Sequence, residues 1–489
     1  MKNTYITLLN VILLLLSLFA CDPSTKPKTG SLSGRVILVN DTGDSALDPV
    51  DYSGITISLY RLAEYDTSLV NIINKHPNLD FQINQNSEFE HQNALPIQKT
   101  ISIADGSFKL DKVSYGDYNL VLEKNGWGYR YIYNVSVDNK ENNLSVFQEQ
   151  LQLYPEKKIS GTISESFEVE NWHHLVVEDD TMFLPSSNLS LGPNGFLRIN
   201  PAVQVNVAGT VKLTGANENM FQIVLNRCDE ENDSPNPYTH FNLLSSVALS
   251  GDIRNGRFSG GARNLGLNGT DNVNIFRCRF LVDSDGIYAN QVSGLNIEQS
   301  ALTASVTTRG IGTGIYNSYG CSIQYNLFYH MLKGSEVIAS NDVQLENNSF
   351  IKIDSGVESY DTNTEIRYNY FHENKLAMRL AGTSSPQVNN NQIESEQGIT
   401  IGKSGYYYNC TPVINNNNFF CPLMFLMLTR PNTAEINAKL NYYYTSDAIV
   451  IRSKIRHKPD YPESQQAEIG YFIYEPFRTT KVPNAGIVN

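Results

Sequence analysis

The sequence has little charge and still less positive charge. Only 18% of its 489 residues are charged, and 37 lysines and arginines stand against 50 aspartates and glutamates, so the formal net charge is −13. A nucleic-acid partner normally requires a basic face, and this composition argues against one. Helical periodicity is also missing from residues 271–443, where short apolar runs are separated by Gly, Asn, Ser and Asp. These features indicate an all-β protein.

Motifs for metal binding and nucleophilic catalysis are scarce. The eight histidines are scattered, and His173 and His174 are adjacent, so in a strand they point to opposite faces. The six cysteines contain no Cys-x-x-Cys pair, and a Ser-His-Asp arrangement cannot be placed. We therefore expect no metal site. A disulfide between Cys410 and Cys421 stays open as an alternative to buried thiols.

A long apolar run occurs only at the N-terminus. Lys2 precedes the largely apolar residues 6–18, which are too few to span a bilayer comfortably and have the length expected of a signal peptide. The run ends Leu18-Phe19-Ala20-Cys21, which resembles a bacterial lipobox. The resemblance implies a signal peptide at residues 1–20, lipidation of Cys21 and a membrane anchor at the bacterial cell envelope, on the outer membrane or cell surface. Residues 21–30 are rich in Pro, Lys and Thr and are expected to form a tether.

Residues 271–443 repeat themselves. Each copy carries an aliphatic residue followed five positions later by a large apolar residue, and the steps between the leading residues are 22, 26, 22, 21, 22, 26 and 22. This period is typical of solenoids. The pairs are Ile275/Phe280, Ile297/Leu302, Ile323/Phe328, Leu345/Phe350, Ile366/Phe371, Val388/Ile393, Ile414/Phe419 and Ile436 with a degraded Asn441.

Asparagine recurs three positions after the leading aliphatic residue. In a parallel β-helix, equivalent residues of successive coils stack about 4.8 Å apart. Stacked amides can then hydrogen-bond along the column inside a bend, where Asn also tolerates left-handed backbone angles. Cys278 and Ser300 hold the same place in earlier copies. The predicted structural ladder consists of Asn326, Asn348, Asn369, Asn391 and Asn417.

A second strand is predicted in each coil, marked by Gly and a following apolar residue, as in Gly286-Ile287, Gly314-Ile315, Gly356-Val357 and Gly398-Ile399. Leucine-rich repeats share this period, but they need a leucine three positions before the first apolar residue of the core motif. Here those positions are mostly polar. We therefore predict a right-handed parallel β-helix of about 22 residues per coil, extending over residues 157–445.

Residues 31–156 have a different pattern, with alternating apolar residues and an Asp105-Gly106 turn, and are predicted to form a small antiparallel β-sandwich. Their order Gly-x-Val, Asp-Gly-x-Phe and Gly-x-Tyr resembles the carboxypeptidase regulatory-like domain, a transthyretin-like or Ig-like sandwich. The resemblance implies a spacer or protein-contact module. A long insertion, residues 61–99, departs from that pattern.

The solenoid resembles the pectate-lyase-like superfamily of exported proteins, from its opening residues 196–211 onward. Its far end, Asn441-Tyr442-Tyr443-Tyr444-Thr445, is similar to a closing segment that usually reads Asn-Trp-Trp-Gly-Thr. Residues 446–489 are expected to cap the last coil, because an open solenoid end exposes an apolar edge. We expect Ser446 to cap a helix whose Ile451 and Ile455 cover that end.

The resemblance implies, where such proteins are enzymes, a base, cations and often calcium on one outer face. The weak catalytic candidates are Glu358, Arg379, Asp283 and Asp285. We expect Glu358 and Arg379 to be stacked neighbours that form a surface ion pair of little energetic role. Ser284-Asp285-Gly286 echoes a polygalacturonase motif, but the paired Asp and the His of those enzymes are missing, so we interpret it as a turn. The predicted outer column after the second strand is Tyr288, Tyr316, Ile338, Glu358, Arg379 and Thr400.

Tyrosines Tyr288, Tyr316 and Tyr407 are weak candidates for binding sugar rings. The pattern favours a monomeric cell-envelope lipoprotein whose β-helix surface binds a glycan or protein without catalysis. The alternatives are a polysaccharide lyase or glycoside hydrolase, with Ca²⁺ if it is a lyase, and a purely structural envelope protein. An outer cluster of three acids with Arg or Lys would favour the enzyme, and an uncharged aromatic strip would favour binding.

Overall fold

The computed structural model describes residues 28–40, 51–64, 66–79, 86, 89–144, 151–217, 219–226, 239–304, 310–402, 410–427 and 432–488. The predicted signal peptide and Cys21 lie outside these ranges. Contacts divide the chain into two compact units, one of residues 1–64 with 88–154 and one of residues 65–87 with 155–489. Within the described ranges, no helix has the length and apolar character needed to cross a bilayer.

The first unit is a small β-sandwich. One sheet has the order β4-β3-β6-β7 and the other has the order β5-β1-β8, with a short β2-β9 pair beside them. Between the sheets lies an apolar core that includes Leu32, Ile57, Leu110 and Leu120, all without exposed surface. The strands are β1 (Thr29–Arg35), β2 (Ile37–Leu38), β3 (Thr56–Arg61), β4 (Gln98–Ile101), β5 (Ser107–Ser114), β6 (Gly116–Glu123), β7 (Tyr129–Val137), β8 (Glu141–Asn143) and β9 (Gln152–Leu153).

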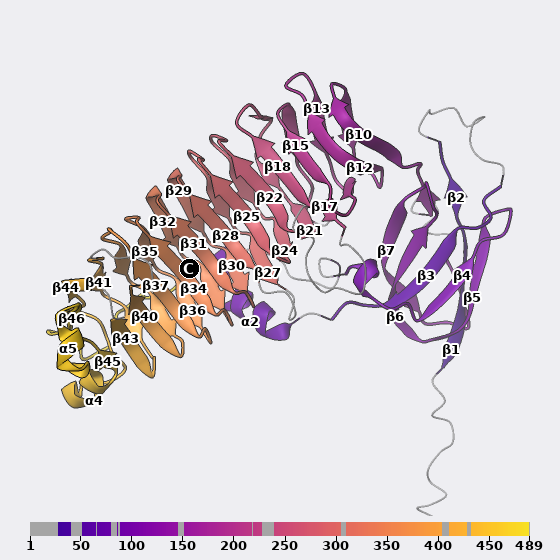
Figure 1. Ribbon diagram of the computed structural model, residues 1–489. Coiled ribbons are helices and arrows are strands. Elements are labelled where there is room, and N and C mark those ends of the chain that lie inside the picture. The colour runs from indigo at the N-terminus through magenta and orange to yellow at the C-terminus, as the bar shows by residue number, and fades with distance from the viewer. Residues whose placement is uncertain are drawn as a thin grey trace, which may run out of the picture. The chain divides into compact units, whose positions relative to one another are not determined.

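The second unit is a parallel β-helix, which confirms the predicted fold (Figure 1). Its first coils contain β10 (Lys157–Ile163), β11 (Ser166–Val169), β12 (His174–Phe183), β13 (Asn188–Leu191), β14 (Phe196–Ile199), β15 (Gln204–Val207), β16 (Thr210–Leu213), β17 (Phe221–Leu225), β18 (His240–Leu244) and β19 (Ala248–Leu249). Each later coil has three strands, which form three faces called sheets A, B and C here.

Sheet A consists of β20 (Ile253–Arg254), β23 (Asn274–Phe276), β26 (Asn296–Glu298), β29 (Tyr319–Gln324), β32 (Asn341–Glu346), β35 (Glu365–Arg367), β38 (Gln387–Asn389), β41 (Val413–Asn415), β44 (Asn432–Asn437) and β46 (Ile469–Ile473). Sheet B consists of β21 (Gly256–Gly260), β24 (Arg279–Val282), β27 (Ala301–Ala304), β30 (Leu327–Tyr329), β33 (Ser349–Ile351), β36 (Tyr370–His372), β39 (Gln392–Glu394) and β42 (Asn418–Phe419). Sheet C consists of β22 (Arg263–Asn268), β25 (Asp285–Asn290), β28 (Ile311–Tyr316), β31 (Lys333–Ile338), β34 (Ser355–Tyr360), β37 (Leu376–Ala381), β40 (Gln397–Ile401) and β43 (Leu423–Met427).

The prediction of two strands per coil was therefore wrong. The leading aliphatic residue lies in sheet A and the large apolar residue five positions later lies in sheet B, as Ile366 in β35 and Phe371 in β36 show. A tight bend separates them, so what looks like one strand in the sequence is two strands on different faces. Both side chains point into the core, where Phe350 and Phe371 stack with ring centroids 4.9 Å apart.

The asparagine column lies in the bend between sheets A and B and is fully buried. The backbone N–H of Asn348 donates to Oδ1 of Asn369 (2.9 Å), and Nδ2 of Asn369 donates to the carbonyl of Leu345 one coil back (2.8 Å). The same pattern runs through the column, and Asn417 N–H donates to Asn441 Oδ1 (2.8 Å). Asn441 thus continues the ladder and is not a degraded apolar position.

Left-handed backbone angles occur one position before the ladder and not in it. Asn347, Tyr368 and Asn390 have φ of 56°, 58° and 55°. The bend turns at these residues, and the ladder residue that follows keeps an ordinary backbone so that its amide points inward. Asparagine is therefore selected in the column for its hydrogen bonds and not for its backbone freedom.

The solenoid thiols that the structure describes are buried. Cys278, Cys321 and Cys421 are free cysteines, so the alternative of a Cys410–Cys421 disulfide was wrong. The sulfur of Cys410 lies 3.6 Å from Oγ of Ser384. Burial raises the pKa of Cys278 to about 12 and that of Cys421 to about 11, which keeps both groups protonated and unreactive.

The C-terminal residues close the solenoid with two short α-helices, the second of which is α5 (Glu463–Gln466), and two further strands. The cap of α4 (Ala448–Ser453) is Asp447, whose carboxylate accepts from the N–H groups of Ile449 and Val450, so the expectation of Ser446 was wrong. An aspartate one residue nearer the helix reaches the free N–H groups and adds a favourable negative charge. Ile451 has no exposed surface and Ile455, in β45 (Ile455–Arg456), has 3%, and both join the solenoid core.

Candidate functional site

Sheet C carries a strip of polar side chains on its outer face. The alternate residues Ile287, Val337, Val357 and Met378 belong to the core, so the residues between them point outward. In register, one outward column contains Tyr288, Gly314, Glu336, Glu358, Arg379 and Thr400, and the next contains Asn290, Tyr316, Ile338, Tyr360 and Ala381.

The predicted column was therefore wrong at two of its members, Tyr316 and Ile338, which lie one column further along the strand. The physical reason is a change of chemistry in the core. Thr313 and Ser335 occupy the inward place that other coils give to Ile or Val, and their buried hydroxyls bond each other at 2.9 Å. The motif of glycine followed by an apolar residue therefore marks Gly314-Ile315 in this coil. Ile315 lies two residues after Thr313, which is the true equivalent of Ile287.

Two stacked glutamates form the centre of the strip. Glu336 and Glu358 are paired in register and are 7% and 5% exposed. Lys333 donates to both, at 3.0 Å to Glu358, and hydroxyls complete the network: Tyr316 donates to Glu336 (2.8 Å) and Tyr360 to Glu358 (2.5 Å). Each carboxylate thus has an ammonium and a phenol, which offsets the cost of its burial.

The ionisation of this cluster follows from the same contacts. Burial alone would raise the pKa of Glu358, but hydrogen bonds from Tyr360 and Lys333 and the charge of Arg379 hold it below its usual value. Burial would lower the pKa of Lys333, but its bonds to the two glutamates raise it instead. Burial and the neighbouring carboxylates raise the pKa of both Tyr316 and Tyr360. At neutral pH Glu358 and Lys333 are therefore charged and the two phenols are neutral.

One end of the strip is formed by Arg263, Asp285, Tyr288 and Tyr316. The guanidinium of Arg263 lies over the Tyr288 ring at 3.7 Å from its centroid, and the rings of Tyr288 and Tyr316 are 5.0 Å apart. Tyr288 is therefore already stacked and offers less ring surface to a sugar than its sequence position predicts. Burial raises the pKa of Asp285. The charge of Arg263 opposes this increase, and the charge of Glu336 adds to it.

Arg379 forms the other end, in register with Glu358 as predicted. Its Nε is 3.8 Å from Oε1 of Glu358, too long for a hydrogen bond, and this buried Nε has no hydrogen-bond partner in the part of the chain that the structure describes. The expected ion pair between Arg379 and Glu358 is present at 3.8 Å, but it is not a pair of surface groups, because Glu358 is buried and has a closer cation in Lys333.

Of the remaining predicted residues, the structure describes Asp283. Asp283 is 7% exposed and lies in the bend before β25. Tyr407 and Cys21 lie outside the described residues. Sequence reasoning missed Arg263, Lys333, Glu336 and Tyr360. The 22-residue interval between Glu336 and Glu358 equals one coil and was the signal that pairs them.

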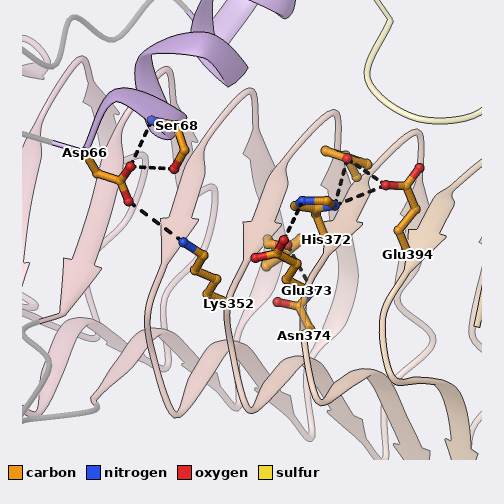
Figure 2. A network of polar contacts seen from close by, with 9 residues as sticks. Asp66, Ser68, Lys352, His372, Glu373, Asn374 and Glu394 are labelled. Carbon is orange, nitrogen blue, oxygen red and sulfur yellow. Dashed lines mark hydrogen bonds and ion pairs between the residues drawn. The ribbon is translucent and has the colours of Figure 1, made fainter. Parts of the chain in front are cut away.

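A second polar network lies on the outer face of sheet B (Figure 2). Nδ1 of His372 is 3.1 Å from Glu394 Oε2, and its Nε2 is 3.4 Å from Glu373 Oε1. The two carboxylates approach opposite ring nitrogens, so they do not converge on one point as metal ligands would. Among the residues that the structure describes, no three His, Cys, Asp or Glu side chains are placed to hold a metal ion.

Comparisons with known proteins agree with the fold. A family model for a right-handed β-helix region matches residues 309–421. No curated protein matches the chain. Among solved structures the chain is similar, at 8% identity over 89% of each chain and a TM-score of 0.24, to the catalytic domain of a GH87 alpha-1,3-glucanase in complex with tetrasaccharides. At that TM-score the likeness carries no argument about function. The chain is a right-handed parallel β-helix repeat protein.

Proposed function

We propose that this protein is a cell-envelope lipoprotein that binds an acidic polysaccharide along the outer face of sheet C without cleaving it. Its anchor would be Cys21, and the sandwich would be a carboxypeptidase regulatory-like spacer, both by resemblance in sequence. The observation that carries the proposal is the distribution of hydrogen-bonding capacity in the strip. The glutamates of the strip already have partners in Lys333 and the two tyrosine hydroxyls. In contrast, the guanidiniums of Arg263 and Arg379 make no hydrogen bond to any residue in the described ranges.

The two arginines stand at opposite ends of the strip, five strand spacings or about 24 Å apart. Guanidinium groups bind carboxylates and sulfates through paired N–H donors. An extended chain that carries acidic groups at intervals can therefore reach both ends, while the hydroxyls of Tyr316 and Tyr360 stay engaged with the glutamates. The chain as a whole carries a formal charge of −13, so the attraction must come from these local sites.

The test is binding of the full mature chain to a polyuronate, a sulfated glycan and a neutral glycan, measured by calorimetry at physiological salt. Arg263→Gln and Arg379→Gln are each expected to weaken binding to an acidic glycan roughly tenfold or more. Arg367→Gln is the matched control, since Arg367 lies on sheet A and is already paired with Glu346 (3.1 Å) and Glu365 (3.6 Å). Equal binding by all three variants would contradict the site, and retention of no glycan would contradict the function.

A second candidate is a polysaccharide lyase or glycoside hydrolase with its centre on the same strip. It is favoured by the three acids Asp285, Glu336 and Glu358 with Lys333 and Arg379 on neighbouring coils. Asp285 has a raised pKa and Glu358 a lowered one, the division of roles that an acid and a base require. Unsaturated products or new reducing ends from the same glycan panel, lost in Asp285→Asn, would establish this activity in place of simple binding.

A further inference from the structure

The segment Asp66–Leu79 belongs in sequence to the sandwich but packs on sheet B of the solenoid. Its helix α2 (Thr67–Lys75) begins at Asp66, whose Oδ1 accepts from the N–H (2.9 Å) and hydroxyl (2.6 Å) of Ser68. The other oxygen accepts from the hydroxyl of Tyr329 (2.5 Å) and lies 4.0 Å from Nζ of Lys352 (Figure 2). One carboxylate therefore both caps the helix and fastens it to two neighbouring coils.

Apolar side chains on one side of α2 cover a stripe on sheet B. Leu69 is 5% exposed and packs with Ala301, Leu327 and Ile351, which lie on three successive coils. Ala301 and Leu327 are in register, and Ile351 is in register with Tyr329, two residues further along the strand. Further along the helix, Ile72 and Ile73 pack in a cluster with Leu79, Tyr370 and Ile487. The opposite side of α2, with Asn71 and Asn74, is exposed.

Side chains take part in the hydrogen bonds that join residues 66–79 to the solenoid, as when Nε2 of Gln299 donates to the carbonyl of Asn78 (3.2 Å). In the ranges that the structure describes, no backbone hydrogen bond joins residues 66–79 to a strand of sheet B. The strands beneath, β27, β30 and β33, are each bonded to a strand on both sides, so they keep these bonds when α2 leaves. A nine-residue helix has little stability of its own and depends on its docking surface. Such an element is expected to open locally with far less free energy than the coils.

We propose that residues 66–79 form a strap that opens and closes as one unit while the solenoid remains folded, and that the closed strap covers the apolar stripe of Ala301, Leu327 and Ile351. The strap lies more than two hundred residues earlier in the chain than the coils it covers. When it is closed, the strap covers sheet B at these coils.

Hydrogen exchange of the full chain, resolved by peptide, tests the strap. In the wild type, amides of residues 69–76 are expected to exchange at least roughly tenfold faster than those of β27, β30 and β33. Leu69→Asp is expected to remove the remaining protection of α2 while the three strands stay within about twofold of the wild type. Asn71→Asp introduces the same charge on the exposed side and is expected to change neither. Tyr329→Phe keeps the ring and is expected to give an intermediate effect on α2.

Two results would overturn the strap. One is wild-type exchange of α2 as slow as that of the strands, which would make it an inseparable part of the solenoid. The other is loss of protection in β27, β30 and β33 when Leu69→Asp opens α2, which would show that helix and coils unfold together. Binding of an apolar dye provides a second measurement, expected to rise severalfold for Leu69→Asp and to stay unchanged for Asn71→Asp.

Discussion

At the scale of single residues, the solenoid depends on polar groups that it buries and satisfies. Asn369 has no exposed surface, yet its Oδ1 accepts from the N–H of Asn348 and its Nδ2 donates both to the carbonyl of Leu345 and to Oδ1 of Asn391. One side chain thus provides for two backbone groups that the bend removes from strand pairing. The ladder residues recur because leucine in their place would leave both of these groups unpaired, and serine has only a single O–H to donate.

Asn369→Ala is expected to lower the free energy of unfolding by about 2 kcal/mol, because a buried N–H and a buried carbonyl each lose a partner. Chemical denaturation followed by circular dichroism measures the change. Asn389→Ala removes an amide of the same size from the outer face of sheet A, in the same coil as Asn391, and is expected to cost less than about 0.5 kcal/mol. Equal costs for the two variants would contradict a structural ladder.

Lys333 has a comparable role on the outer face of sheet C, because it is the cation shared by two buried glutamates. Lys333→Met is expected to destabilise the protein by about 3 kcal/mol at pH 7, since it removes the ammonium that the buried side chains of Glu336 and Glu358 share. In the wild type the lowered pKa of Glu358 contributes stability above the ordinary pKa of 4.5, and this is lost as the pH falls through the folded value.

In Lys333→Met the pKa of Glu358 is expected to rise, so that its carboxylate becomes protonated as the pH falls toward 5. The deficit in the free energy of unfolding relative to wild type is therefore expected to shrink. Unfolding curves at several pH values measure this. Lys375→Met is the control, because Lys375 is 62% exposed and its 2.9 Å pair with Asp354 is a surface ion pair worth less than about 1 kcal/mol. A deficit for Lys333→Met that does not vary with pH would contradict the account.

At the scale of elements, the C-terminal cap contains a buried histidine that must stay neutral. Nδ1 of His457 accepts the backbone N–H of Phe472 (3.0 Å), and the side chain is 5% exposed. Burial and the charge of Arg452 lower the pKa of His457, against the opposing charge of Asp460. The nitrogen that holds β46 in place is therefore lost as an acceptor when the ring is protonated.

Because the folded pKa lies below the ordinary 6.5, the stabilisation is complete above pH 6.5 and falls as the pH drops toward the folded value. We expect a slope of up to about 1.4 kcal/mol per pH unit in that window. His457→Asn is expected to flatten it, whereas His330→Asn, at a position with φ of 62° that asparagine tolerates, is expected to leave it unchanged. Thermal unfolding between pH 5 and 7.5 provides the measurement.

Elements also differ in how far they can be predicted from sequence. The coil period and the ladder were predictable because Ile366, Asn369 and Phe371 each serve the core and recur at a constant offset. The register of the outer strip was not predictable, because Thr313 and Ser335 stand at inward positions that are apolar in other coils. The motif of glycine followed by an apolar residue therefore does not mark the register there. Arg263, Lys333 and the two glutamates come together only once that register is known.

The covering of sheet B by α2 could not be predicted either. The contact between Asp66 and Tyr329 joins residues 263 positions apart, and no periodicity within the solenoid refers to it. Outward Ala301, Leu327 and Ile351 are apolar in three successive coils, which in retrospect marks a face that another element covers. These outward residues do not belong to the repeated inward positions from which the coils are predicted.

At the scale of the whole molecule, a solenoid is one-dimensional: each coil buries its apolar side against its neighbours, and the ends must be closed by something else. Helix α4 closes the C-terminal end, with Ile451 buried in the same core as Phe425 and Phe472, whose rings stack 4.7 Å apart. Ile449 lies on the same helix but is 82% exposed. The helix therefore offers two isoleucines in opposite environments.

Ile451→Asp is expected to detach α4 and leave the last coil uncovered, because a carboxylate cannot be buried there without a partner. The exposed apolar coil and its strand edges then join those of other copies, and sedimentation velocity should show concentration-dependent association. Ile449→Asp adds the same charge to the same helix and is expected to leave the sedimentation coefficient unchanged. Association of both variants, or of neither, would mean that the end of the solenoid does not depend on this helix for its closure.

The remaining coils are bonded to their neighbours independently of α4, so Ile451→Asp should keep the far-ultraviolet spectrum of the β-helix while it associates. A general loss of strand signal would instead show that the cap is needed for folding.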